Sequence, residues 1–148
     1  MRFQTNIKHC NTYVYFALTG DNFDPQMITE RIGIRPTESW ITGDKGKYIQ
    51  RLNYSLWELS TVKGKEYLFI GSLVEELVSS LYDKINIINT LKSEFKLNSV
   101  LQIVLDVDTN EEQSTPALGF DLKTIEFLFK TGTTIDVDIY RFNSAISS

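Results

Sequence analysis

Tyr13-Val-Tyr-Phe-Ala-Leu18 is an apolar run that is followed by Asp24-Pro25 and then by Gly33. Near the other end of the chain, Val100-Leu-Gln-Ile-Val-Leu105 is followed in the same order by Asp121, Gly132 and a last apolar segment at 134–140. An apolar run predicts a buried strand, and an Asp before and a Gly after a short segment are typical of helix ends. Two such strand–helix–strand units in 148 residues predict one α+β domain built around a pseudo-repeat.

Between the two copies, the sequence predicts a hairpin and a long helical segment. Residues 38–42 and 54–61 have strand composition, and the turn residues Gly43-Asp-Lys-Gly46 lie between them. Residues 71–95 predict helix with a possible break near Tyr82-Asp83, because Asp83 could cap a second helix. The apolar residues recur there at three- and four-residue steps: Val74, Leu77, Val78, Leu81, Ile85, Ile88, Leu91 and Phe95.

We therefore expect a single domain over residues 1–148, with a mixed, largely antiparallel sheet of about five strands and helices mainly on one face. The closest named architecture is a variant of the ferredoxin-like plait. In the helix 25–32, Met27 and Ile28 are expected to be buried. In the strand 134–140, alternation predicts that Ile135, Val137 and Ile139 point inward and that Asp136, Asp138 and Tyr140 point outward.

Composition argues against membrane and secreted classes. No apolar run approaches the roughly 20 residues that a membrane span needs. The N-terminus Met1-Arg-Phe-Gln-Thr-Asn6 lacks the pattern of a secretory signal, and the lone Cys10 cannot form an internal disulfide. We expect a cytoplasmic protein with no membrane partner.

The charge is uneven along the chain. Residues 1–71 carry nine Lys and Arg against seven Asp and Glu, whereas residues 72–148 carry six against twelve. An acidic chain does not follow a phosphate backbone unless its bases cluster, and the basic residues Lys45, Lys47 and Arg51 near Tyr48 and Tyr54 are more typical of a solvated hairpin tip. We expect no nucleic-acid partner, while the acidic tract 106–112 could neutralise a basic protein.

Two acidic pairs lie on predicted strands, Asp106 with Asp108 and Asp136 with Asp138. If the strands were neighbours, four carboxylates could meet and hold Mg²⁺ or Ca²⁺. The alternative is the solvated face of a half-buried sheet. We expect the second arrangement, no metal, and a melting temperature unchanged by Ca²⁺, because the flanking sequence supplies no further ligands.

The chain offers no assembled catalytic set. His9-Cys10 contains the one His and the one Cys, so neither a zinc site nor a Ser or Cys triad can be completed. Phosphate-loop and dinucleotide fingerprints are absent. We expect no cofactor and favour a protein that is not an enzyme.

The hairpin region carries the candidate site, which comprises Arg35, Glu38, Trp40, Asp44 and Trp57. A cation, two carboxylates and two indoles could line a ligand pocket or anchor a protein partner. The alternative is that the indoles cap the edge of the core and that Arg35 pairs with a carboxylate.

Several of these motifs resemble the bacterial DUF4279 family, whose name denotes a domain of unknown function. The resemblance rests on Leu18 to Trp40, with its Gly33-Ile-Arg-Pro-Thr37, on the later Gly43-Asp44 and Trp57, and on Gly119-Phe-Asp-Leu122 through Ile135-Asp-Val-Asp-Ile-Tyr140. It implies a small intracellular bacterial protein and supplies no catalytic residues.

For function, we expect a non-enzymatic protein-binding module, such as an immunity-type or regulatory partner of a bacterial toxin or other target. The alternative is a small-ligand-binding or enzymatic domain with a pocket around Arg35, Glu38 and Trp40.

Overall fold

The computed structural model describes residues 11–46, 51–64 and 69–146. In chain order the elements are β1 (Tyr13–Gly20), α2 (Pro25–Ile32), β2 (Glu38–Trp40), β3 (Ser55–Ser60), α3 (Ile70–Leu81), the 3₁₀ turn η1 (Tyr82–Lys84), α4 (Ile85–Phe95), β4 (Asn98–Asp108), α5 (Leu122–Thr131) and β5 (Thr134–Phe142). The strands form one sheet with the order β2-β3-β1-β4-β5, in which β4 and β5 are parallel and the other neighbours antiparallel. The α+β class and the five-stranded, largely antiparallel sheet are thus confirmed.

The first four strands have the order of the ferredoxin-like plait. β4 lies beside β1, β1 beside β3, and β3 beside β2, while α2 connects β1 to β2 and α3 and α4 connect β3 to β4. β5 extends this plait as a parallel strand, reached from β4 through α5. The two copies of the pseudo-repeat therefore differ, because β3 separates β1 from β2 whereas β4 and β5 are direct neighbours.

The predicted helix ends are confirmed by their hydrogen bonds. Asp24 accepts from the Gln26 amide at 2.9 Å at the start of α2, and Asp121 accepts from the Thr124 amide at 2.9 Å at the start of α5. Gly33 and Gly132 end these helices with φ values of 79° and 63°, a conformation that favours glycine. The break predicted near Tyr82-Asp83 is the 3₁₀ turn between α3 and α4. The predicted cap is wrong, because Asp83 lies inside this turn and Lys84, which makes no side-chain cap hydrogen bond, takes the N-cap position of α4.

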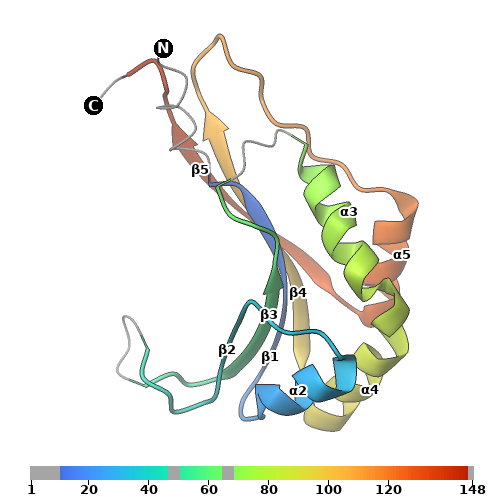
Figure 1. Cartoon of the computed structure of the whole chain (residues 1–148). Helices are drawn as coiled ribbons and strands as arrows, with labels where there is room; N and C mark the ends of the chain where they lie inside the picture. The colour runs from blue at the N-terminus through green and yellow to red at the C-terminus, as the bar shows by residue number, and fades with distance from the viewer. Residues whose placement is uncertain (1–10, 47–50, 65–68, 147–148) are drawn as a thin grey trace.

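The helices cover one face of the sheet, and no helix of the described residues covers the other face (Figure 1). Phe16 on β1 contacts Phe127 on α5 edge to face, with ring centroids 5.8 Å apart. The helix-covered face of β4 is equally apolar, since Leu101, Ile103 and Leu105 are all buried. The core thus lies between the sheet and the helices, and the other sheet face, which we call the open face, is free to carry polar residues.

Two burial predictions are wrong. Met27 is 41% exposed on α2, where Pro25, Ile28 and Ile32 supply the buried side instead. Ile135 and Ile139 are 41% and 59% exposed, although they lie in register with the buried Leu101 and Leu105. Their face was predicted correctly, but β5 is the edge strand of the described sheet, and of its three inward residues only Val137 is partly buried against the core.

Candidate functional site

Strand alternation places a group of acidic and aromatic side chains on the open face. Glu38 on β2 and Ala17 on β1 are both in register with Glu58 on β3, so Glu58 lies between them. Trp40 is in register with Leu56, which lies two residues before Glu58 and therefore on the same face. Tyr54 lies two residues before Leu56, so the same alternation directs it to this face. Tyr15 lies two residues before Ala17 on β1 and therefore on the same face. We call Tyr15, Glu38, Trp40, Tyr54 and Glu58 the carboxylate–aromatic cluster.

Glu58 is the most perturbed group of this cluster. Its residue is only 8% exposed. Burial, followed by the nearby charge of Glu38, raises the pKa of Glu58 to about 7, and Lys63 opposes the rise. Within the described ranges, no side chain or amide donates a hydrogen bond to this carboxyl. Glu58 is therefore a largely buried acid that forms no ion pair within the described residues, where Lys63 only partly offsets the effect of burial.

The aromatic members of the cluster are Tyr15, Trp40 and Tyr54. Trp40 contacts Tyr54 edge to face with centroids 5.5 Å apart, and the Trp40 Nε1 is buried with no acceptor in the described part of the chain. Burial and then the charge of Glu58 raise the pKa of Tyr15 to about 12, and the same two causes raise the pKa of Tyr54. Carboxylates between aromatic rings attract ammonium and guanidinium groups, which gain charge pairing and cation–π contact together.

The structure divides the five residues of the predicted site. Glu38 and Trp40 belong to the cluster, whereas Arg35 is exposed in the loop between α2 and β2. The Asp44 carboxylate accepts from the Ile41 amide at 2.9 Å and so stabilises the hairpin turn. Trp57 is fully buried on the helix-covered face, where its Nε1 donates to Thr29 Oγ1 at 3.0 Å.

Sequence reasoning missed Glu58 and Tyr15. The signal was available in Tyr54-Ser-Leu-Trp-Glu58, because alternation that directs Trp57 to the core directs Glu58 to the opposite face. Nothing in the sequence indicated that Glu58 would pair with Glu38, since that depends on the register of β2 against β3.

The two acidic pairs lie on neighbouring strands but are staggered. Asp136 and Asp138 are in register with Gln102 and Val104, while Asp106 is in register with Tyr140. The Asp106 and Asp108 carboxylates accept backbone amides, from Asn11 at 2.8 Å and from Ser144 at 3.0 Å respectively. Among the residues that the structure describes, no group of three or more His, Cys, Asp or Glu side chains is placed to hold a metal ion.

Part of the basic hairpin lies outside the described residues, namely Lys47 and Tyr48, as do His9 and Cys10. Arg51 donates to the Gly43 carbonyl at 3.0 Å, so its guanidinium stabilises the hairpin.

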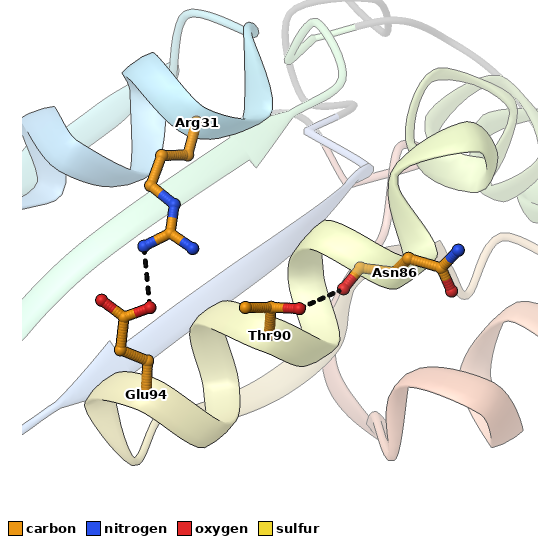
Figure 2. Close-up of polar contacts among 4 residues, drawn as sticks. All are labelled: Arg31, Asn86, Thr90 and Glu94. Carbon is orange, nitrogen blue, oxygen red and sulfur yellow. Dashed lines mark hydrogen bonds and ion pairs between the residues drawn. The ribbon is translucent and has the colours of Figure 1, made fainter.

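A groove of about 270 Å³ lies between α2 and α4 and is lined by Arg31, Asn86, Ile87 and Thr90. Figure 2 shows that Arg31 reaches across to Glu94, with 2.9 Å between Nη1 and Oε1. Thr90 donates to the Asn86 carbonyl at 3.0 Å within α4. The charged group of this groove is thus already paired, in contrast to Glu58.

The fold and this cluster define a small α+β domain with an acidic, aromatic sheet face. The chain belongs to the DUF4279 family, described as a domain of unknown function, whose model matches residues 9–142. Searches of curated proteins and of solved structures found no match. None of the helices in the described part of the chain is long and apolar enough to cross a bilayer.

Proposed function

We propose that this protein is a non-catalytic binding module that recognises a basic partner protein through the carboxylate–aromatic cluster. The partner would be a bacterial toxin or another regulatory target, and the two proteins would meet in the cytoplasm of a bacterium. Glu58 carries the proposal, because the residue is only 8% exposed, lies opposite Glu38 in the β2–β3 pair, and its carboxyl has no hydrogen-bond donor among the described residues. A buried charge is costly when it is left unpaired.

A Lys or Arg side chain from a partner would supply the missing charge. Glu38 is exposed and lies at the outer side of the pair, while Glu58 lies deeper, so an incoming long side chain meets Glu38 first. The rings of Trp40 and Tyr54 would contact its methylene groups or its guanidinium plane. Ionisation of Glu58 would then accompany binding, and affinity should rise as the pH increases from about 6 to about 8.

Removing the Glu58 charge should weaken partner binding without unfolding the protein. We expect Glu58→Gln to reduce affinity about 30-fold, which corresponds to about 2 kcal/mol for one desolvated charge pair. The partner would first be identified by capture from the native host, and we expect its gene to lie beside the gene of this protein. Its affinity for the unmodified chain and for Glu58→Gln would then be measured by calorimetry with purified proteins. Glu76→Gln, an exposed carboxylate on α3, is the matched control and should bind like the unmodified chain.

Equal affinity of Glu58→Gln and Glu76→Gln for the purified partner would contradict the proposal. So would a captured partner that is acidic, or one whose binding does not depend on pH.

The second candidate is a small-ligand-binding or enzymatic domain around Arg35, Glu38 and Trp40. The pKa of about 7 at Glu58 favours it, since a carboxyl that titrates near neutrality suits general acid–base catalysis. A ligand present at one hundred times its dissociation constant should add about 2.7 kcal/mol of stability. The test is a thermal-shift screen of small amines and guanidines. If none of them raises the melting temperature, and if Arg35→Ala behaves like the unmodified chain in the same screen, this candidate is excluded in favour of the protein-binding role.

A further inference from the structure

The groove between α2 and α4 is a second site on the molecule, and the function proposed above does not use it. Its volume is about 270 Å³, below the roughly 300–1,000 Å³ of pockets that hold drug-sized ligands. The groove belongs to the helix layer, whereas the carboxylate–aromatic cluster lies on the open face of the sheet (Figure 1). An occupant of this groove would therefore be a small molecule, bound apart from the cluster.

Arg31 is the charged residue among those that line the groove in the described structure. Its Nη1 donates to Glu94 Oε1 at 2.9 Å, and the guanidinium makes no other hydrogen bond within the described residues. Figure 2 shows the second terminal nitrogen of Arg31 directed away from Glu94, on the side of Thr90. Because a guanidinium is a planar fork of N–H donors that matches a carboxylate, Arg31 retains donors for a second carboxylate.

The ion pair between Arg31 and Glu94 indicates which chemistry the groove accepts. The two side chains are 35% and 46% exposed, so water screens the attraction between them and the pair contributes little to stability. A carboxylate is thus already held at the edge of the groove, but only by a weak single contact. An external carboxylate can compete with it.

The groove also offers apolar contact beside Arg31. Ile87 is half-buried and packs against the core. Thr90 donates its hydroxyl to the Asn86 carbonyl at 3.0 Å, which leaves its methyl group to contact an occupant. In Figure 2 the side-chain amide of Asn86 points away from Arg31. An occupant would therefore meet a cation at one end and aliphatic groups next to it.

We propose that the groove binds a small carboxylic acid with a short aliphatic chain. The carboxylate would accept hydrogen bonds from the unused N–H groups of Arg31, and the chain would lie against Ile87 and the Thr90 methyl group. Glu94 would oppose binding, since its negative charge already attracts the same guanidinium. This inference goes beyond the proposed function, because it assigns a ligand class to a different part of the molecule.

The test is an NMR titration of the full chain with 4-methylpentanoate. One control is 4-methylpentanamide, which has the same shape without the charge, and the other is acetate, which has the charge without the chain. We expect the acid to bind with a dissociation constant on the order of 1 mM and to shift the amide signals of Ile87 and Thr90. Both controls should bind at least about tenfold more weakly.

Variants of the ion pair separate ligand binding from a purely structural contact. Arg31→Gln should weaken binding of the acid at least about tenfold, whereas Glu94→Gln should strengthen it about threefold. Glu76→Gln makes the same charge change as Glu94→Gln on α3 and should alter the affinity by less than about twofold. Arg31→Lys keeps the charge without the planar fork and provides a second folded variant, which should bind about threefold more weakly.

No shift of the Ile87 and Thr90 signals at about 20 times the expected dissociation constant would overturn the proposal. Equal binding of the acid and either control would do the same, and so would an affinity that Glu94→Gln lowers or leaves unchanged. Glu58→Gln should leave the affinity for the acid unchanged, so a failure at the groove is distinguishable from a failure at the cluster.

Discussion

Trp57→Ala should lower the free energy of unfolding by about 3–5 kcal/mol, a large fraction of the stability of a domain of this size. Trp57 is fully buried between the sheet and α2, and its indole also donates to Thr29 Oγ1 at 3.0 Å. Truncation leaves a cavity and an unused hydroxyl acceptor. Urea denaturation followed by circular dichroism measures the change.

Trp40→Ala is the matched control on the other face of the same hairpin. Trp40 is half-buried, and its main aromatic contact is with Tyr54 at 5.5 Å. Its truncation should cost about 1 kcal/mol. Trp57→Phe, which keeps most of the volume, provides a folded variant if Trp57→Ala does not fold. Equal losses for Trp57→Ala and Trp40→Ala would contradict the assignment of the two indoles to opposite faces.

Glu58→Gln should remove a strong pH dependence of stability. Because the pKa of Glu58 rises from 4.5 to about 7 on folding, the folded state holds this proton more tightly than the unfolded state. The resulting stability is present below about pH 4.5 and is lost as the pH rises through about 7. We expect the unmodified chain to lose at most about 3 kcal/mol, because solvent screens part of this effect, whereas the glutamine variant cannot ionise.

Denaturation curves at pH 5 and pH 8 measure this difference. Glu58→Gln should be clearly more stable than the unmodified chain at pH 8 and close to it at pH 5. Glu38→Gln should reduce the pH dependence without removing it, because burial of Glu58 is the larger cause of the shift. A parallel pH dependence of the unmodified chain and Glu58→Gln would show that Glu58 ionises freely in the folded state.

The local rules of the sequence predicted most of the fold. Asp24, Gly33, Asp121 and Gly132 mark helix ends because their hydrogen bonds and backbone angles are set by immediate neighbours. The exposure of Ile139 could not be predicted in this way. Alternation gives the face of a strand, but burial depends on whether a helix covers that strand.

The candidate site shows the same limit. Glu38 and Trp40 could be selected from the sequence because charged and aromatic residues stand close together in the hairpin. Trp57 has the same local signal but lies on the opposite face from Trp40, since it is in register with Ser39. Glu58 became notable only through its register with Glu38 and through its own burial, which no local pattern specifies.

The most direct test of the central claim is the titration of the Glu58 side-chain carboxyl by carbon-13 NMR, in the free chain and with saturating hexa-arginine peptide. We predict an apparent pKa of about 7 in the free chain and a clearly lower value in the complex, because a guanidinium stabilises the ionised form. A value near 4.5 in the free chain, or a value near 7 that the bound peptide leaves unchanged, would contradict the account.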